Sequence, residues 1–331
     1  MKAKGEKVRI AMIGAGGRAT SVIYPSIAGN PDAEFAGVCD IDEERRNAAA
    51  KQFGIKKTYG AKGVYEYQEM LKELKPDAVA IIGQPHIMYD LWEWALVNGF
   101  NLLIEKPMAL SIHQARMLCF LAEKNKLITQ VSFQRRYTPM VMQLRDECLK
   151  RGPVTHAVCR FYKCGIAPMT CARDHMMDDC VHSIDTLRWI CGGEIVKIES
   201  HCKRIGVPDI NFISATLYFD NGATGYLINT WSSGKRVFEV EIHSPNIYIT
   251  AEHECKGRLF ADNDVEGVEY DSPACAGSDE FHVYTGCANV VEDFVNGIKT
   301  GKLPSACFQS SIKTMEAAEI ILAQDLLGSR G

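Results

Sequence analysis

A glycine-rich segment near the N-terminus has the composition of a turn that binds a dinucleotide. It reads G-x-G-x-x-A, follows the short apolar run 8–13 and opens a helical pattern. In such a turn the first glycine permits a tight bend, the second lets the backbone approach a pyrophosphate, and the small last residue lets the helix pack closely. The helix N-terminus then offers free N–H groups to the phosphates. The expected cofactor-binding residues of this turn are Gly14, Ala15, Gly16, Gly17, Arg18 and Ala19.

An acidic residue at the end of the next predicted strand favours this interpretation over a chance glycine-rich turn. Asp40 closes the strand pattern of residues 34–39, about 20 residues after Ala19. A carboxylate there accepts hydrogen bonds from ribose hydroxyls and repels a 2′-phosphate. Arg18 could attract that phosphate, but its place inside the turn favours a pyrophosphate contact or a solvated side chain. We give Asp40 more weight and expect NAD as the cofactor rather than NADP.

Polar residues at two other places could act on a substrate. Lys106 follows a short predicted strand, and ligands of doubly wound sheets bind outside the carboxyl ends of the strands. The predicted helix 178–190 carries Asp178, His182 and Asp185 at i, i+4 and i+7, which places them on one helix face. A histidine with a carboxylate one turn away has its tautomer and proton affinity set, as a general base requires.

Each of these residues also has a plainer interpretation. A lysine at a strand end is often a surface residue, and a histidine beside an aspartate is often a satisfied pair in a core. His175, Cys180 and His182 are close enough in sequence to suggest a metal site, but they lack the ligand spacing of zinc sites. Hydride transfer to or from the expected NAD cofactor needs no metal, so we expect no metal site.

The elements that position these residues divide the chain into two domains. Up to about residue 133, continuous apolar strands alternate with helices, which is typical of a parallel sheet buried on both faces. Right-handed crossovers then make a doubly wound Rossmann domain. Later strands alternate in polarity, and Asp220-Asn221-Gly222 is a hairpin signal. We expect an α/β plus α+β fold, with a Rossmann domain at 1–134 and, at 135–331, an open, mainly antiparallel sheet covered by helices on one face.

Composition limits the class of protein and its surroundings. The 331 residues carry a formal net charge of −4, which gives no electrostatic case for nucleic acid or for an anionic membrane. No apolar run approaches the ~20 residues of a membrane helix, and no signal peptide is recognised. The 13 cysteines include no C-x-x-C pair, so they fit buried side chains in a reducing compartment. We expect a cytoplasmic protein.

Four patterns along nearly the whole chain resemble the Gfo/Idh/MocA family, named for glucose-fructose oxidoreductase, inositol dehydrogenase and rhizopine catabolism. They are G-A-G-G-R-A at Gly14, E-K-P at Glu105, Q-R-R-Y at Gln134 and D-x-x-x-H-x-x-D at Asp178. The resemblance implies an NAD(P)-dependent oxidoreductase that transfers a hydride between a secondary hydroxyl of a sugar, polyol or glycoside and the nicotinamide. It also implies an oligomer interface on the second sheet, for which we expect a homodimer or a homotetramer.

The resemblance assigns roles to single residues. It implies that Lys106 contacts substrate and cofactor, that His182 is the catalytic base, that Asp178 assists it and that Asp185 is structural. Gln84, Tyr89 and Cys180 depart from the family's usual threonine, histidine and glycine, which leaves the substrate open. The further cofactor contacts expected are Gly83, Gln84, Pro85, Glu105 and Lys106, and the substrate contacts expected are Lys106, Arg136, Tyr162, Asp178 and His182, with Arg160, Trp231, His282 and Tyr284 as weaker candidates.

Two other functions use the same residues differently. Some relatives couple a transient oxidation to cleavage of a glycosidic bond, and product analysis would distinguish this reaction. Other relatives bind the dinucleotide and act as regulators without catalysis. A regulator should lack the catalytic pair, whereas this chain has both Lys106 and His182.

Overall fold

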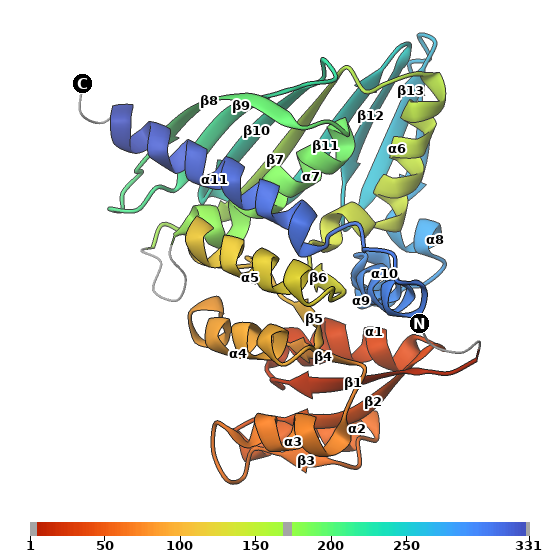
Figure 1. Ribbon diagram of the computed structural model, residues 1–331. Coiled ribbons are helices and arrows are strands. Elements are labelled where there is room, and N and C mark those ends of the chain that lie inside the picture. The colour runs from red at the N-terminus through yellow and green to blue at the C-terminus, as the bar shows by residue number, and fades with distance from the viewer. Residues whose placement is uncertain (1–4, 168–173, 329–331) are drawn as a thin grey trace. The chain divides into compact units, whose positions relative to one another are not determined.

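The chain folds into two compact units in a computed structural model that describes residues 5–167 and 174–328. The first unit comprises residues 1–132 and 287–312, and the second comprises residues 133–286 and 313–331. Figure 1 labels most of the helices and strands of both units. The expected boundary after residue 134 lies within two residues of the first crossing between the units.

The sheet of the first unit has six parallel strands in the order β3-β2-β1-β4-β5-β6. The chain winds outward in opposite directions from β1 and from β4, so this is the expected doubly wound sheet. All four residues of β4 are buried, as a central parallel strand requires. The strands are β1 Val8–Ile13, β2 Ala33–Cys39, β3 Thr58–Tyr59, β4 Ala78–Ile81, β5 Asn101–Ile104 and β6 Thr129–Val131.

The helices of the first unit begin and end at residues suited to those positions. The side chain of Asp42 accepts a hydrogen bond from the backbone N–H of Arg45 at 3.0 Å, and Gly54 ends the same helix in the left-handed conformation. Ser111 caps a later helix in the same way. The helices are η1 Ala19–Ile23, α1 Tyr24–Gly29, α2 Glu43–Phe53, α3 Glu66–Leu74, α4 Pro85–Val97, α5 Ile112–Lys124, α10 Cys287–Thr300 and the first residues of α11 Phe308–Gly328.

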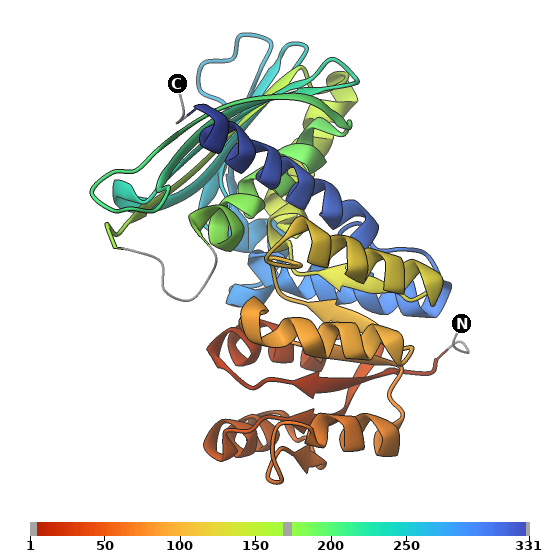
Figure 2. The ribbon, with the colours of Figure 1, turned by 60° about the vertical axis from the view of Figure 1, so that its left-hand side comes forward.

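The second unit is built on an eight-stranded sheet in the order β14-β13-β12-β11-β7-β10-β9-β8. Every neighbouring pair is antiparallel except β7 and β10, which confirms the expected mainly antiparallel sheet. In Figure 2 these strands form one curved layer with α11 beside it. The strands are β7 His156–Cys164, β8 Ile195–Lys203, β9 Phe212–Phe219, β10 Thr224–Thr230, β11 Ser232–Ser244, β12 Ile247–Glu252, β13 Lys256–Ala261 and β14 Val268–Asp271.

Helices of the second unit pack against one face of this sheet. Helix α7 contacts β7 and β10, α6 contacts β11 and β12, and Gln324 of α11 donates a hydrogen bond to the backbone of β8 at 2.8 Å. The row of buried residues Ala157, Cys159 and Phe161 marks the covered face of β7. The helices are η2 Gln134–Tyr137, α6 Pro139–Arg151, η3 Met176–Cys180, α7 Val181–Cys191, α8 Ser272–Ala276, α9 Phe281–Tyr284 and the rest of α11.

The chain crosses between the two units after residues 132, 286 and 312, whereas the sequence predicted a single crossing after residue 134. Residues 287–312 return to the first unit, although the expected second domain included them. Helix α10 is amphipathic, and its apolar side packs against α1, η1 and β6. The backbone N–H of Val131 in β6 donates to the carbonyl of Ala306 at 2.9 Å, so the returning segment also borders the edge of the first sheet.

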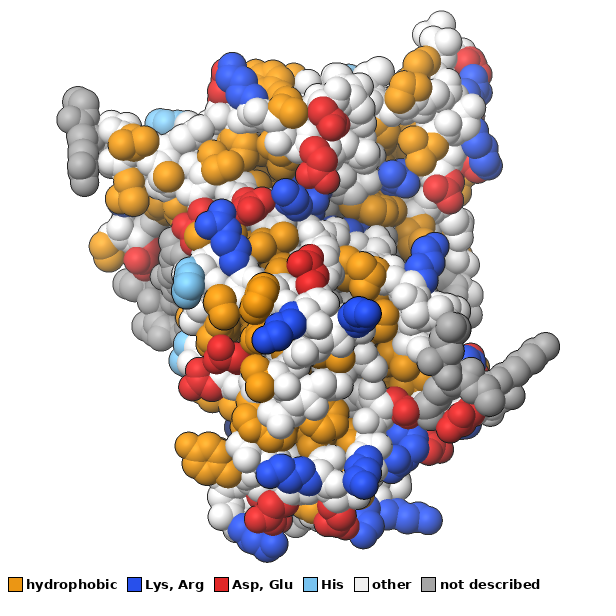
Figure 3. Space-filling model, viewed as in Figure 1, with side chains coloured by type: hydrophobic (Ala, Val, Ile, Leu, Met, Phe, Trp, Pro, Cys, Tyr) orange, Lys and Arg blue, Asp and Glu red, His pale blue; other side chains and the backbone are white. Residues whose placement is uncertain are grey.

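Charged side chains of both signs are interspersed on the face shown in Figure 3, in keeping with the small net charge. Within the described residues, no helix has the length and apolar character needed to cross a membrane.

Candidate functional site

The turn between β1 and η1 has the geometry that a bound pyrophosphate needs. Gly14 has a φ of +98°, and a Cβ atom there would lie 2.1 Å from the carbonyl oxygen of Ile82, so no other residue fits. A Cβ at Gly16 or Gly17 would meet nothing within 4 Å, which means that their backbone faces open space. Ala19 is buried against the unit's core. The turn therefore fits a dinucleotide pyrophosphate, with backbone that a phosphate can approach.

Asp40 lies directly against this turn. Its Oδ2 accepts the backbone N–H of Ala15 at 2.6 Å, and its Oδ1 accepts the backbone N–H of Asp42 at 2.8 Å. Gly60, which follows β3, also lies close to Asp40, because a Cβ atom at Gly60 would lie 2.1 Å from the Asp40 carbonyl oxygen. The structure thus brings the acidic residue and the glycine turn together, with the carboxylate oriented by two backbone donors.

The E-K-P segment follows β5 and is tied to the same turn. Arg18 Nε lies 3.1 Å from Glu105 Oε1, and Glu105 Oε2 accepts the backbone N–H of Lys106 at 3.3 Å. Burial would lower the pKa of Arg18, but the Glu105 carboxylate outweighs it and raises that pKa above its ordinary value. This ion pair could not be predicted from the sequence, because its members are far apart in the chain.

The loop after β4 adds the residues that the family pattern placed beside the cofactor. Gln84 precedes α4 in an extended conformation, and Pro85 is the first residue of that helix. A Cβ at Gly83 would lie 2.4 Å from the Met88 side chain, so the loop passes closely over α4. These three residues follow β4, the central strand between β1 and β5, at the carboxyl edge of the first sheet.

The predicted catalytic helix belongs to the second unit and opens with a π-helical turn. Asp178 lies in η3, and His182 lies in the first turn of α7. The His182 side chain is buried, and the Phe133 ring meets its imidazole edge-on at 5.9 Å between centroids. Single π-turns inside helices are frequent at functional sites, because they shift side chains from their regular positions. Lys106, the other residue expected to act on the substrate, belongs to the first unit.

Asp185 and Arg136 form a buried ion pair in the second unit. Arg136 Nε donates to Asp185 Oδ2 at 2.8 Å, and Arg136 Nη2 also pairs with Asp185 Oδ1. The side chains are 4% and 1% exposed. Thr314 donates to the same carboxylate at 3.3 Å and accepts from Arg188 at 3.1 Å. Arg136 was expected to contact substrate, but the structure commits its guanidinium to this internal network.

Tyr162 lies on the sheet face opposite α7. Side chains alternate along β7, so Phe161 is on the helix-covered face while Arg160 and Tyr162 are on the other. Arg160 confirms this placement, because it pairs with Glu239 at 2.7 Å and with Glu241 on the neighbouring β11. The sheet therefore separates Tyr162 and Arg160 from His182, and the expected substrate contacts at these two positions are not supported.

A second polar cluster lies beside Asp178 on the helix-covered face. The rings of His175 and Trp231 stack at 4.2 Å, and Trp231 Nε1 donates to Asp179 Oδ2 at 3.1 Å. Lys163 also pairs with Asp179. Burial lowers the pKa of His175. Across residues 5–167 and 174–328 no group of His, Cys, Asp and Glu has an arrangement that could hold a metal ion.

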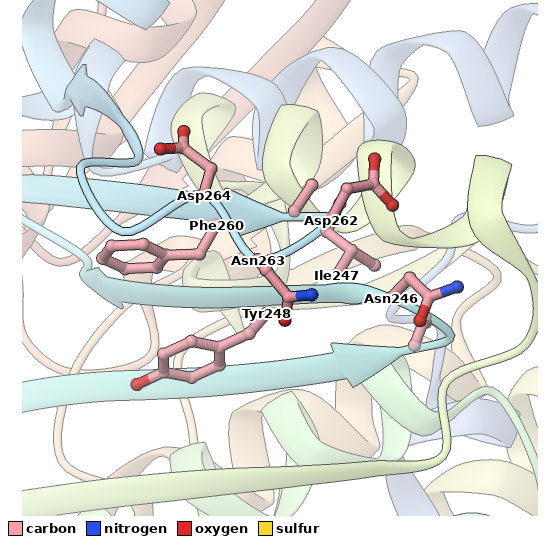
Figure 4. Close-up of a pocket in the computed structure, with 9 residues that line it drawn as sticks. Asn246, Ile247, Tyr248, Phe260, Asp262, Asn263 and Asp264 are labelled. Atoms are coloured by element: carbon pink, nitrogen blue, oxygen red, sulfur yellow. The ribbon is translucent and has the colours of Figure 1, made fainter.

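The face of the second sheet opposite α7 carries a row of aromatic rings, which we call the ring row. Its members are Tyr226, His156, His243, Tyr248 and Phe260. It runs across five adjacent strands. Figure 4 shows Tyr248 and Phe260 beside the turn of residues 262–264, where they border a depression of about 570 Å³. Burial and the neighbouring His156 lower the pKa of His243. The successive centroid distances are 6.5 Å for Tyr226–His156, 4.0 Å for His156–His243, 4.6 Å for His243–Tyr248 and 5.7 Å for Tyr248–Phe260.

Comparison with known proteins matches both units. A protein-family profile described as "Oxidoreductase family, NAD-binding Rossmann fold" matches residues 8–133, and one described as "GFO/IDH/MocA C-terminal domain" matches residues 168–247. Among solved structures, a dehydrogenase from Chromobacterium violaceum superposes with a TM-score of 0.87 at 18% identity, covering 98% of this chain and 97% of that one. At that identity the likeness shows the fold.

Two curated relatives are similar over part of their length. The chain is 30% identical over 140 residues to the D-glucoside 3-dehydrogenase of Escherichia coli (strain K12), which covers 42% of this chain. It is 24% identical over 233 residues to the scyllo-inositol 2-dehydrogenase (NAD(+)) of Bacillus subtilis (strain 168), which covers 66% of this chain. The chain spans 38% and 66% of the length of these two relatives.

Proposed function

Because this chain belongs to the Gfo/Idh/MocA oxidoreductase family, we propose that it transfers a hydride between a secondary hydroxyl of a sugar, polyol or glycoside and a nicotinamide cofactor. The named activities of the two curated relatives support this substrate class. One observation carries the proposal. The glycine turn, Asp40 and the E-K-P segment meet at the carboxyl edge of one doubly wound sheet, where open α/β sheets bind their ligands.

The cofactor that we propose is NAD. Gly14, Gly16 and Gly17 would hold the pyrophosphate through their backbone, and Asp40 would accept hydrogen bonds from the ribose hydroxyls. When bound, the nicotinamide ring supplies the hydride acceptor or donor. Arg18 supports NAD over NADP, because its guanidinium is already paired with the Glu105 carboxylate and is therefore less able to attract a 2′-phosphate.

Three residues act on the substrate in this proposal. His182 takes the proton from the reacting hydroxyl, and Asp178 orients its ring. Lys106 is the cation that stabilises the negative charge developing on the same oxygen. The burial of His182 supports this role, since a general base shielded from water exchanges its proton with the substrate. We leave Arg136 and Tyr162 out of the substrate site, because one is paired with Asp185 and the other lies across the sheet.

We also propose that the ring row is the centre of an interface with a second copy, giving a homodimer or a tetramer of two dimers. Tyr226 is 42% exposed, and the helices that the structure describes around this sheet pack on its other face. A face with several aromatic rings left in water is unusual for a monomer. An isologous contact would bury the same rings from both copies.

Turnover of a panel of sugars, polyols and glycosides, followed by nicotinamide absorbance with NAD and with NADP, tests the proposed reaction. His182→Ala should lower kcat by about 10²–10⁴ while leaving NAD affinity nearly unchanged. Lys106→Ala should be at least as harmful, and Asp178→Asn milder. His113→Ala, on the exposed side of α5, is the matched control. Near-native kcat in His182→Ala would remove this histidine from the reaction, and products with a cleaved glycosidic bond would change the reaction class.

A further inference from the structure

The side chain of Arg18 connects three segments of the first unit that are far apart in the sequence. Its Nε lies 3.1 Å from Glu105 Oε1, and its Nη2 lies 3.8 Å from Cys287 Sγ at the start of α10. Arg18 follows β1 and Glu105 follows β5, whereas β4 lies between these two strands in the sheet. The guanidinium therefore reaches past the end of β4, along the edge where doubly wound sheets bind their ligands.

Glu105 carries this connection onward to Lys106. Its side chain is 7% exposed, and its two oxygens have different partners. One oxygen meets the Arg18 guanidinium, while the other accepts the backbone N–H of Lys106 at 3.3 Å. The same buried carboxylate thus holds the arginine of the glycine turn and the backbone from which the Lys106 side chain starts.

A buried carboxylate that loses its cation must protonate, move or find another positive charge. A Glu105 carboxylate that moved would no longer accept the backbone N–H of Lys106, so the backbone from which the Lys106 side chain starts would shift.

We propose that Arg18 is a positioning residue for Lys106, acting through Glu105. By engaging the carboxylate, Arg18 fixes the backbone at Lys106 and so the position from which its side chain reaches the substrate. This inference rests on the proposed function of Lys106. It differs from the role that the motif alone suggests for Arg18, which is a direct contact with the pyrophosphate.

A cycle of two substitutions distinguishes these roles. In Arg18→Gln the carboxylate is left without its partner, so kcat should fall by about 10²-fold, the size of effect that a misplaced catalytic group produces. Glu105→Gln keeps the shape and removes the stray charge, so its effect should be mild. The double variant should then recover most of the kcat lost in Arg18→Gln, which is the non-additivity expected of residues in contact.

The opposite pattern overturns the inference. If Arg18 only binds the pyrophosphate, Arg18→Gln raises the dissociation constant of NAD, leaves kcat unchanged, and combines additively with Glu105→Gln. Arg9→Gln is the matched control, because its pair with Glu34 at 3.9 Å is exposed and Arg9 lies inside β1, before the glycine turn. If Arg18→Gln does not fold, Arg18→Lys replaces it, since it keeps the charge without the planar donor geometry.

A measurement without cofactor or substrate separates this inference from the proposed reaction. Amide hydrogen exchange in a peptide covering residues 101–110 should become faster in Arg18→Gln than in the native protein, and remain native-like in Arg9→Gln. Unchanged exchange overturns the connection between Arg18 and Lys106. A native protein that reduces no nicotinamide with any substrate of the panel overturns the proposed reaction instead, and the exchange result still decides whether Arg18 holds this segment.

Discussion

Replacing Asp185 by asparagine removes the negative charge that faces Arg136 inside the second unit. The isosteric amide keeps the volume of the side chain, so no cavity forms. What changes is that a guanidinium only 4% exposed loses its carboxylate. The carboxylate also accepts a hydrogen bond from Thr314 at 3.3 Å, and Thr314 in turn accepts from Arg188, so the change reaches α11.

The expected loss of stability is large for a single substitution. Removing one partner of a buried ion pair costs about 3–5 kcal/mol, because the remaining charge is buried without compensation. Against a typical total of about 5–15 kcal/mol, this is a substantial share of the free energy of unfolding. The midpoint of thermal unfolding should fall by roughly 4–7 °C for a chain of this size. The double variant Arg136→Met with Asp185→Leu should recover most of this loss, because it leaves neither charge unpaired.

Urea titration followed by circular dichroism measures these differences. The control is Asp262→Asn, which breaks another two-point pair between arginine and aspartate, at 3.0 and 2.7 Å from Arg151, but at the surface. We expect no measurable change there, because water and salt screen exposed pairs. The reasoning fails if Asp185→Asn keeps native stability and loses turnover. That outcome would return Arg136 to the substrate site and give Asp185 a role there as well.

Three further predictions concern the cofactor, the assembly and the response to acid. Asp40→Ala should weaken NAD binding and reduce the discrimination against NADP, measured as dissociation constants by fluorescence titration; a native protein that binds NADP at least as tightly would contradict the role of Asp40. Tyr226→Glu should give monomers in sedimentation at micromolar concentration, where the native protein should remain a dimer or larger. Burial lowers the pKa of His253 from 6.5 to about 3. As the pH falls through that window, the unfolded chain takes up a proton that the folded protein does not, so the free energy of unfolding drops by up to about 1.4 kcal/mol per pH unit. The same curve in His253→Gln should be flatter, and equal slopes would contradict the prediction.

The first sheet could be predicted well because its signals are local. Continuous apolar strands, short helices and the order of turns define a doubly wound sheet, and the observed strand order agrees. Gly14 and Asp40 could be placed for the same reason. The motif implies a close backbone approach at the glycine and an acidic residue at the end of the next strand, and the structure has both.

Features that depend on distant partners could not be predicted. The partner of Arg136 is 49 residues away, so only the fold reveals that its charge is internal. Alternation along β7 separates Tyr162 from Phe161, but the sequence does not say which face the helices cover. The strand β8 shows weak alternation, with exposed residues at most positions, so its sequence carries no clear strand pattern. The π-turns η1 and η3 also leave no pattern that distinguishes them from ordinary helix.

The return of residues 287–312 to the first unit has a consequence for biosynthesis. The six strands are complete once residue 131 has been made, but α10 and the segment that borders β6 are about 155 residues further along the chain. At typical rates of synthesis this interval takes roughly 10–30 s. During this interval, the residues that pack against the apolar side of α1 and against the sheet edge at Val131 have not yet been synthesised. We expect this half-built intermediate to be the species that a chaperone holds, and the whole chain, rather than its N-terminal third, to be the smallest piece that yields a soluble dinucleotide-binding unit.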